Sequence, residues 1–445
     1  MRKIILLFTG FLITVNSFGQ WSELGGTNSL QANGDVLTTT IDQSGNVYAA
    51  GEFTNTTNRP YVAKYDGTTW STLGNSTYFE AGRSITAMTY HSGNLYVGGT
   101  FRNSENNQFV AVYNGTSWSE LGGNNSLQAN GDINTIAIDN TGNIYTAGDF
   151  TNSNGVLYVA RYNGSNWSEV GGTDSFDETG PNINDMAFDS LNNLYVVGNF
   201  LNNFSNTYIS KYDGTSWSEL NITIASVGSN SLQSILIDDS DTIFTAGNLF
   251  NTNSRNFVAT YNGTSWSEVG GDNSLNQTSP IFVLKKDTND NIYIGGELRN
   301  GAGRYYVAQF DGTNWSEYYS DPSLGATNII RTISIASDNE PITAGDFVNG
   351  NGNRFVATTS LELLSTSEFE HNNAISFYVD TETKLLRMQS ENASIIDTSI
   401  YDITGKAVTI HNPNTEIDVS AFESGIYLLG IKTNTDFITH KFTIQ

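Results

Sequence analysis

The sequence predicts an all-β protein: a seven-bladed β-propeller, closed by an N-terminal strand, followed by a small C-terminal β-sandwich. Two periodic features carry this prediction. All seven tryptophans recur every 48 to 50 residues, at Trp21, Trp70, Trp118, Trp167, Trp217, Trp266 and Trp315. A glycine keeps nearly the same interval, at Gly51, Gly99, Gly148, Gly198, Gly247, Gly296 and Gly345. A period of about 40–50 residues with four strand-like runs per unit is typical of propeller blades.

Residues 1–19 have the three parts of a secretory signal peptide. Two basic residues precede an apolar run over residues 4–15, and small residues allow cleavage between Gly19 and Gln20. A membrane anchor is the alternative, but the run is too short to span a bilayer, and no later segment approaches that length. We therefore expect export to the periplasm and a mature chain without a transmembrane segment.

The composition narrows the classes of partner and chemistry. The chain has 20 Lys+Arg against 45 Asp+Glu, a formal net charge of −25. This excess argues against nucleic acid and anionic membranes as partners. The absence of cysteine excludes disulfides, thiolate metal sites, a cysteine nucleophile and lipid attachment through an N-terminal cysteine. An acidic extracellular protein kept soluble by self-repulsion fits both observations.

The third repeat shows what one blade is expected to contain. Gly148 is predicted to let neighbouring sheets approach, and Tyr162 and Trp167 to pack as an aromatic pair across a hairpin. These repeated residues are predicted to be structural. The expected strands are 133–138, 144–148, 158–162 and 167–170, with tight turns at 139–143 and 163–164.

The two ends of the repeat array are predicted to meet in one blade. Residues 21–24 resemble a fourth strand with nothing before it. After Trp315 the chain supplies only a first, second and third strand, at 329–335, 341–345 and 355–359. Pairing the N-terminal strand with this last blade closes the ring and removes an exposed sheet edge.

The repeat resembles two known propeller families. Gly98-Gly99 and the pair Tyr65 and Trp70 are similar to the kelch class, although most blades have Ala or Val before the second glycine. The closer resemblance, over residues 20–360, is to secreted repeats of the fungal cortical polarity-marker family. It is carried by Asn-x-Tyr-x-x-Gly-x-Phe followed by Val-Ala-x-Tyr-Asn-Gly-x-x-Trp. This resemblance implies a fold rather than a chemistry.

Composition changes after Thr359, where residues 361–373 resemble a polar linker and residues 374–445 hold short alternating strands. This last part resembles the type A C-terminal sorting domain of the type IX secretion system of Bacteroidetes. The resemblance implies handling by the type IX machinery, with release or cell-surface attachment after the domain is removed. An ordinary carbohydrate-binding-like sandwich is the alternative. The resemblance rests on residues 400–408, 417–420, 425–429 and 441–444. The usual Tyr-Pro-Asn-Pro start and a basic last residue are absent.

A ligand site is predicted on the propeller face that carries the variable loops, those between strands two and three and between blades. Aromatic and acidic residues there have the chemistry of a sugar site: exposed apolar rings for stacking and planar groups for hydroxyls. Loops that pack on themselves are the alternative. The predicted ligand-binding residues are Tyr78, Phe79, Glu80, Arg83, Arg102, Phe176, Asp177, Glu178, Tyr318, Tyr319 and Asp321.

Arginine placement gives a second signal on the same face. A basic ring that binds an acidic glycan is one interpretation, and local pairing with carboxylates is the other, which we prefer. The loop arginines are Arg59, Arg102, Arg255, Arg299, Arg304 and Arg354. The recurring carboxylates are Glu52, Asp149, Glu297 and Asp346.

No cofactor is predicted, although two segments resemble calcium loops. Residues 238–241 and 287–291 place oxygen ligands at alternate positions, but they align with the ordinary hairpin turn of the other blades. The four histidines and the remaining sequence offer no triad, metal cluster or phosphate-binding loop.

These observations predict a secreted or cell-surface binding module for a carbohydrate or protein partner. One alternative is a polysaccharide lyase or hydrolase that uses loop carboxylates and tyrosines from different blades. Another is a purely structural surface or matrix protein.

Overall fold

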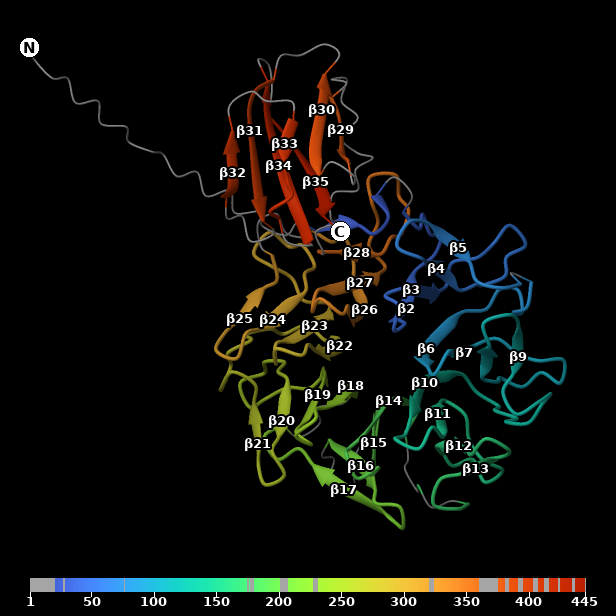
Figure 1. Ribbon diagram of the computed structural model, residues 1–445. Helices are drawn as coiled ribbons and strands as arrows, with labels where there is room; N and C mark the ends of the chain where they lie inside the picture. The colour runs from blue at the N-terminus through green and yellow to red at the C-terminus, as the bar shows by residue number, and fades with distance from the viewer. Residues whose placement is uncertain are drawn as a thin grey trace, which may run out of the picture. The chain divides into compact units, whose positions relative to one another are not determined.

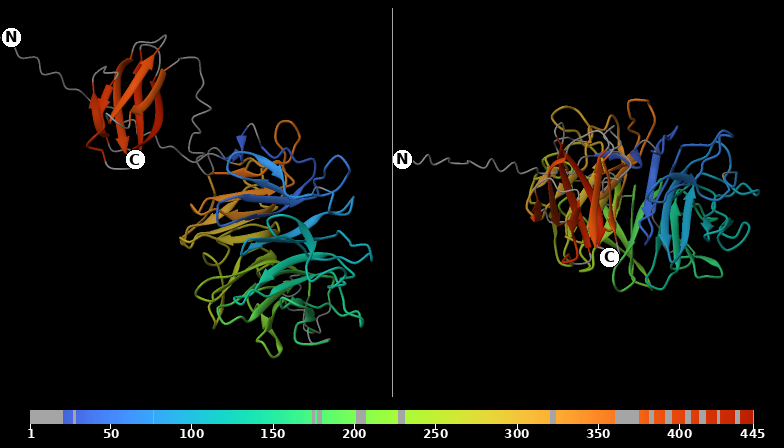
Figure 2. Two further views of the ribbon diagram at one scale, coloured as in Figure 1. Left: turned by 45° about the vertical axis from the view of Figure 1, so that its right-hand side comes forward. Right: turned by 45° about the horizontal axis from the view of Figure 1, so that its top comes forward.

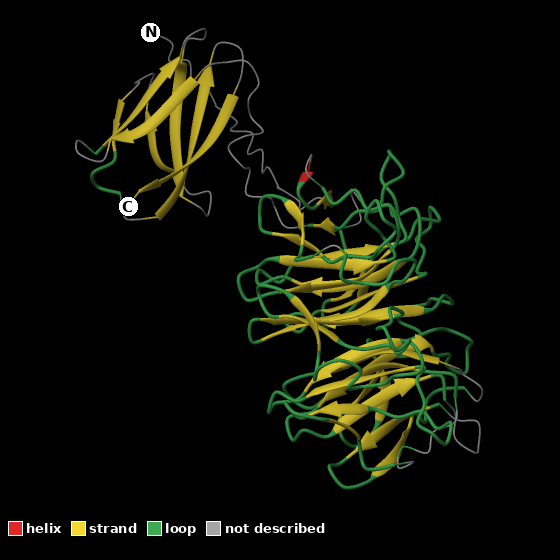
Figure 3. Cartoon of the chain, turned by 90° about the vertical axis from the view of Figure 1, so that its right-hand side faces the viewer, coloured by secondary structure: helices red, strands yellow, loops and turns green. Residues whose placement is uncertain are grey.

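Strands and loops make up nearly all of the protein that its computed structural model describes (Figure 3). No helix among the described residues is long and apolar enough to cross a membrane. Contacts divide the chain into two compact units, Met1–Ser360 and Leu361–Gln445. The described residues are 21–26, 29–75, 77–173, 176, 180–200, 207–226, 231–319, 324–359, 375–380, 384–390, 395–402, 407–411, 416–422, 425–433 and 437–444.

The first unit is a ring of seven four-stranded antiparallel sheets, called blades I to VII below (Figure 1). Blades I to III contain β2 (Val36–Ile41), β3 (Val47–Gly51), β4 (Ala63–Tyr65), β5 (Trp70–Thr72); β6 (Ile85–His91), β7 (Asn94–Gly99), β8 (Ala111–Tyr113), β9 (Trp118–Glu120); and β10 (Ile133–Ile138), β11 (Ile144–Gly148), β12 (Ala160–Tyr162), β13 (Trp167–Glu169). Blades IV to VI contain β14 (Ile183–Phe188), β15 (Leu194–Gly198), β16 (Tyr208–Tyr212), β17 (Trp217–Asn221); β18 (Ser231–Ile237), β19 (Ile243–Asn248), β20 (Ala259–Tyr261), β21 (Trp266–Glu268); and β22 (Ile281–Lys286), β23 (Ile292–Gly296), β24 (Ala308–Phe310), β25 (Trp315–Glu317). Blade VII contains β26 (Ile330–Ile335), β27 (Pro341–Gly345), β28 (Ala357–Thr358) and β1 (Ser22–Glu23).

The ring closes as the sequence predicts, because β1 pairs with β28. Figure 2 shows the blue start and the orange end of the propeller side by side. Ser22 lies opposite Thr358 and Glu23 opposite Ala357. The buried Trp21 supports this pairing by donating its indole N–H to the Tyr318 carbonyl at 3.2 Å. The last blade is therefore built from both ends of the propeller sequence.

The hydrophobic core lies between neighbouring blades, not inside single ones. One cluster combines Tyr48 and Val62 of blade I with Ile85, Val97 and Phe101 of blade II. Second strands such as β11 are buried along their whole length, because a neighbouring blade covers each face. For this reason these strands lack the alternation of apolar and polar residues that is typical of a strand with one face exposed to solvent.

The recurring glycine and the glycine that precedes it in some blades are each explained by a different close contact. A Cβ on Gly148 would lie 2.0 Å from the carbonyl oxygen of Asp132, at the start of its own first strand, where the register shifts at a bulge. The expected approach of a neighbouring sheet at Gly148 is therefore wrong. That approach occurs one residue earlier, where a Cβ on Gly98 would lie 2.3 Å from Cγ2 of Ile133 in the next blade.

The tryptophans link successive blades. Tyr162 and Trp167 pack with ring centroids 5.3 Å apart, as predicted. The indole N–H of Trp167 also donates to the Leu121 carbonyl of the preceding blade at 3.2 Å. The same bond, at 3.0 to 3.4 Å, is made by Trp21, Trp70, Trp118, Trp217 and Trp315. The repeat therefore conserves a bond between blades.

The second unit contains two sheets that share one core. A three-stranded sheet contains Leu386 and Ile417, and a four-stranded sheet contains Ile400 and Leu429; all four side chains pack in one cluster. This is the predicted small sandwich. Its strands are β29 (Ile375–Asp380), β30 (Leu385–Ser390), β31 (Ile395–Asp402), β32 (Ala407–His411), β33 (Glu416–Asp418), β34 (Gly425–Thr433) and β35 (Phe437–Ile444).

Candidate functional site

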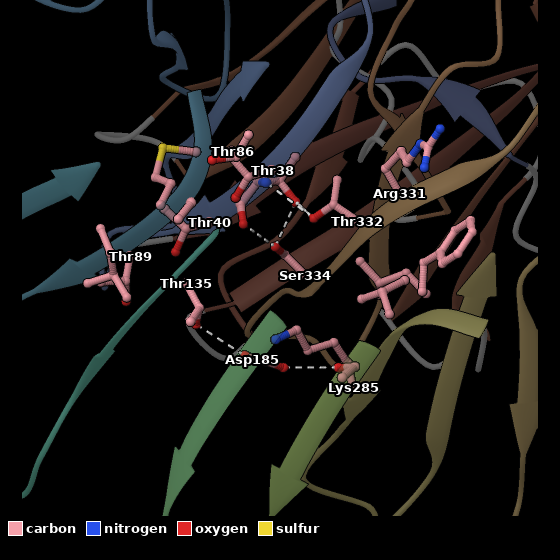
Figure 4. A pocket seen from close by; sticks show the side chains of 18 of the residues that line it. Thr38, Thr40, Thr86, Thr89, Thr135, Asp185, Lys285, Arg331, Thr332 and Ser334 are labelled. Atoms are coloured by element: carbon pink, nitrogen blue, oxygen red, sulfur yellow. Dashed lines mark hydrogen bonds between the residues drawn. The ribbon is translucent and has the colours of Figure 1, made fainter. Parts of the chain in front are cut away.

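The first strands of all seven blades surround a central channel with a cavity of about 560 Å³ (Figure 4). This volume lies in the range of about 300–1,000 Å³ that is typical of ligand sites. Each first strand follows a between-blade connection, so the early strand residues lie at the mouth on the variable-loop face. The late residues lie toward the turns between strands one and two.

Polar residues from several blades line the middle of the channel. The pairing of first with second strands shows which positions of the seven first strands are equivalent. The aligned third position of each first strand lies opposite the residue that precedes the recurring glycine. The third residues are Thr38, Ala87, Thr135, Asp185, Val283 and Thr332; Ser234 aligns with them, because β18 begins one residue earlier than the other first strands. The channel wall therefore carries hydroxyl groups, although those of Thr135 and Ser234 already donate to Asp185 and that of Thr332 bonds the Thr39 hydroxyl.

Asp185 is the single carboxylate among the described residues that line the channel. One of its oxygens accepts from the Met186 backbone N–H at 2.9 Å and the Thr135 hydroxyl at 3.4 Å. The other accepts from the Ile235 backbone N–H at 3.0 Å and the Ser234 hydroxyl at 3.2 Å. Burial raises the pKa of Asp185, although Lys285 and these hydrogen bonds act in the opposite direction.

Lys285 supplies a positive charge to the same stretch of channel. It is the fifth residue of β22, its side chain is exposed, and it extends toward Asp185 (Figure 4). Within the described part of the chain, Lys285 makes neither a hydrogen bond nor an ion pair. The ammonium group is therefore available to a ligand.

Charged groups at the channel mouth bind one another. Arg331 makes two bonds to Asp346, Nε to Oδ1 at 2.9 Å and Nη2 to Oδ2 at 2.7 Å, and lies over the Phe282 ring. Asn134 donates to Asp149 at 2.8 Å. The mouth carboxylates Asp149 and Asp346 are thus held by residues of their own first strands.

The predicted loop aromatics are largely buried, so the expectation of exposed stacking rings is wrong for three of them. Phe79 and Phe176 are 1% and 2% exposed and pack against Trp118 and Trp217, with centroids 5.1 and 4.7 Å apart. Tyr318 is 9% exposed. These side chains fill the space beneath the loops, because each anchors a between-blade connection to the core.

The other predicted residues have varied surroundings. Tyr78 and Tyr319 are half-buried against Trp118 and Tyr318. One Glu80 oxygen accepts from Arg83 at 3.0 Å and from the Arg102 backbone N–H at 3.2 Å. The predicted residues Gly19, Gln20, Asp177, Glu178 and Asp321 lie outside the described residues. Tyr78, Phe79, Glu80 and Arg83 share the connection between blades I and II, and Arg102 of the β7–β8 loop joins them through its bond to Glu80. The remaining described residues, Phe176, Tyr318 and Tyr319, lie in connections between other blades.

The loop arginines are held by several kinds of local contact. Arg354 forms an ion pair with Asp35, Nε to Oδ1 at 2.8 Å. Arg102 donates to Asn106 at 3.0 Å, and Arg299 lies over the Tyr305 ring at 4.4 Å. Of these contacts, that of Arg354 is the pairing with a carboxylate that the sequence favoured, and Asp35 is not one of the recurring carboxylates.

The calcium-like turns use their oxygens in hydrogen bonds. Asp287 accepts from the backbone N–H groups of Asn289 and Asn291 at 2.8 and 2.9 Å. Its second oxygen accepts from the Asn291 amide at 2.7 Å and the Tyr293 hydroxyl at 3.1 Å. In the described residues, no group of three His, Asp or Glu side chains is placed to hold a metal ion.

Sequence comparison of loops missed the channel. Its signal lies in the first strands, where aligned third and fifth positions are mostly hydroxyl or apolar, and Asp185 and Lys285 stand out as charged. The same alignment places Phe79 where other connections have Leu30, Leu127 and Leu275, which marks it as a core anchor. Both signals require the blades to be aligned residue by residue.

Two solved structures are similar to this chain. PorZ, described as a bacterial surface component of the type-IX secretion system of Porphyromonas gingivalis, is 15% identical, with a TM-score of 0.49 over 93% of this chain and 59% of that chain. The extracellular domain of BT4673 from B. thetaiotaomicron, described as a hybrid two component system, is 13% identical, with a TM-score of 0.53 over 95% of this chain and 52% of that chain. The chain thus spans less than two thirds of either structure, and the likeness to the BT4673 domain shows the fold alone.

Family models identify both units. Residues 124–339 match the Rax2 C-terminal beta propeller domain, and residues 380–445 match the secretion system C-terminal sorting domain. No curated protein matches the chain. The resemblances to the cortical polarity-marker family and to the sorting domain are confirmed over these residues: a stretch that matches the Rax2 β-propeller domain precedes one that matches the secretion system C-terminal sorting domain.

Proposed function

We propose that this protein is an exported binding module whose ligand, a carbohydrate or an exposed part of a surface protein, enters the central channel. The observation that carries the proposal is the cavity of about 560 Å³, lined by residues from all seven first strands. Convergent hydroxyl, amide and charged groups in a concave site are the usual signs of ligand recognition. The channel mouth lies on the variable-loop face, so loop residues such as Tyr78 and Arg102 would contact larger ligands.

Export gives the proposal its cellular setting. The sorting domain at residues 380–445 supports handling by the type IX secretion system and delivery to the cell surface or the medium. We further propose that residues 1–19 are removed as a signal peptide in the periplasm before this step. Binding outside the cell also suits a strongly acidic chain.

Binding is favoured over glycoside hydrolysis by the content of the channel. Hydrolysis of glycosides generally uses two carboxyl groups about 5–10 Å apart. The described channel lining provides Asp185 alone, and its oxygens already accept four hydrogen bonds. The proposal is therefore retention of a ligand without turnover.

The test exposes the exported protein to immobilised neutral and acidic polysaccharides and to surface proteins of the producing cells. Retention and the release of reducing or unsaturated ends are both measured. Retention without new ends supports the binding module, and substituting Thr38→Val and Thr135→Val in the channel should weaken it. New ends would replace the proposal with an enzyme, and a lack of retention on every surface would contradict it.

A further inference from the structure

The positively charged side chains that line the channel differ in whether a carboxylate pairs with them. Lys286 binds Asp238 at 2.8 Å and Asp290 at 2.7 Å, and Arg331 binds Asp346 through two bonds. Lys285 makes no ion pair with any described residue, although its side chain is exposed to the channel. It is thus the one channel cation in the described lining whose charge remains available.

Asp185 attracts Lys285 electrostatically, but protein donors already occupy its oxygens. Two backbone N–H groups, of Met186 and Ile235, and two hydroxyl groups hold the carboxylate against blades III and V. Lys285 points toward it (Figure 4). The result is a fixed acid beside an exposed ammonium group that still has its hydrogen-bond donors.

The surroundings of Lys285 define the rest of a matching ligand. Thr40, Thr89 and Ser334 are the fifth residues of their first strands, as Lys285 is, and all three line the same cavity. Ala137 at the equivalent position of blade III leaves that side of the channel open. The Ser334 hydroxyl already bonds the Thr39 carbonyl and hydroxyl, so Thr40 and Thr89 are the hydroxyl groups at this height that remain for a ligand. Hydroxyl groups at the height of one ammonium complement a molecule with one negative charge and several hydroxyls.

We propose that the channel binds a carboxylate-bearing sugar, with the carboxylate on Lys285 and the sugar hydroxyls on the threonine hydroxyls of the channel wall. This inference rests on the proposed function and specifies its ligand class. A single ammonium matches a singly charged carboxylate. Phosphate and sulfate sites more often use arginine pairs or backbone N–H groups at helix ends, and the described channel lining offers neither in free form.

Calorimetry with matched sugars tests the inference on the exported protein. Galacturonate and glucuronate differ from galactose and glucose by a carboxylate in place of a hydroxymethyl group. We expect both uronates to bind at least tenfold more tightly than their neutral counterparts. The variant Lys285→Gln should lower uronate affinity about tenfold and abolish the discrimination, whereas Lys211→Gln, outside the channel, should change neither.

A second variant tests the charge beside Lys285. Asp185→Asn removes this negative charge, so uronate affinity should rise two- to tenfold in the folded variant. Its melting temperature should fall, because the amide NH2 faces protein donors that the carboxylate oxygen accepted from. Equal binding of neutral sugars and uronates, or unchanged discrimination in Lys285→Gln, overturns the inference while the proposed function stands. If neither these sugars nor any immobilised polysaccharide or surface protein is bound, both proposals are wrong.

Discussion

At the scale of single residues, the tryptophans serve the ring and not a ligand. Six of them donate the indole N–H to a carbonyl of the preceding blade. Trp266 is the exception, since its buried Nε1 has no partner. In the preceding blade the equivalent carbonyl belongs to Leu220, which lies inside β17 and pairs with Ile209. A longer fourth strand thus leaves one indole unsatisfied.

This exception provides a matched pair of variants. Trp118 and Trp266 are buried alike, at 7% and 8% exposure, but only Trp118 has a hydrogen-bond partner. We expect Trp118→Phe to cost more free energy of unfolding than Trp266→Phe by about 1 kcal/mol, the net value of one hydrogen bond. Denaturant unfolding measures both, and equal losses would show that packing alone fixes the tryptophans.

The aspartates of the turns should make the stability of the protein depend on pH. Burial raises the pKa of Asp139, but hydrogen bonds from Asn143 and Thr141 outweigh it, so that the pKa is lowered overall. Stability from the ionised form is present above the unfolded-state pKa of about 3.9 and is lost as the pH falls through the lower folded-state pKa. We expect Asp139→Ala to cost about 1–3 kcal/mol at pH 7, because buried donors lose their acceptor.

The difference in free energy of unfolding between the wild-type protein and Asp139→Ala should decrease when unfolding is measured at progressively lower pH, below about 4. Asp239→Ala, at the exposed next position of an equivalent turn, is the control and should change stability by less than about 0.5 kcal/mol. A difference in free energy of unfolding that increases at low pH would contradict the stabilising role of the ionised Asp139 carboxylate.

At the scale of elements, the shortest strand closes the ring. Only two residue pairs join β1 to β28, so a covalent link there should stabilise the propeller. The variant Ser22→Cys with Thr358→Cys would introduce the only cysteines of the chain. Antiparallel partners have Cα atoms about 4.5–5.5 Å apart, within disulfide range.

We expect the oxidised form of this double variant to be more stable than its reduced form by roughly 2–4 kcal/mol. Thermal unfolding with and without a reductant measures the difference, and the single variant Ser22→Cys controls for the substitution itself. An oxidised form that melts below the reduced one would show that β1 does not hold this register in solution.

The contact of Gly98 with the next blade gives a second prediction at this scale. Gly98→Ala places a methyl group 2.3 Å from Ile133 Cγ2, a branch with no freedom to move away. The blades must separate, and we expect a loss of about 1–3 kcal/mol in denaturant unfolding. Gly301→Ala has open space around the new methyl group and should be neutral or slightly stabilising. Similar effects at both positions would refute the close contact.

At the scale of the whole molecule, the net charge of −25 should make stability depend on salt. Repulsion between like charges destabilises a compact acidic protein, and dissolved ions shorten the range of this repulsion. Raising NaCl from about 10 to about 300 mM should raise the melting temperature by a few degrees. CsCl should act equally if screening is the cause, and a melting temperature that falls or differs between the salts would argue against it.

The sequence predicted the architecture because its signal is repeated. Trp and Gly occur once per blade, so blade number, strand order and closure by residues 21–24 all follow from one period. The site was not predictable in this way, since Asp185 and Lys285 each occur in a single blade. The loop aromatic Phe79 misled, because a hydrophobic anchor and a stacking platform have the same composition and differ only in burial.

Closure by β1 also sets an order in time. Trp21 and Ser22 lead the propeller sequence but find their partners at Tyr318 and Thr358. The earliest part of the domain to be synthesised is therefore the last to be placed, and every intervening blade must be present before it docks. The ring can therefore close only when the whole propeller sequence is present in one compartment. A chain that is truncated or stalled before residue 358 keeps an unpaired sheet edge, which is prone to aggregation and which quality-control proteases can recognise.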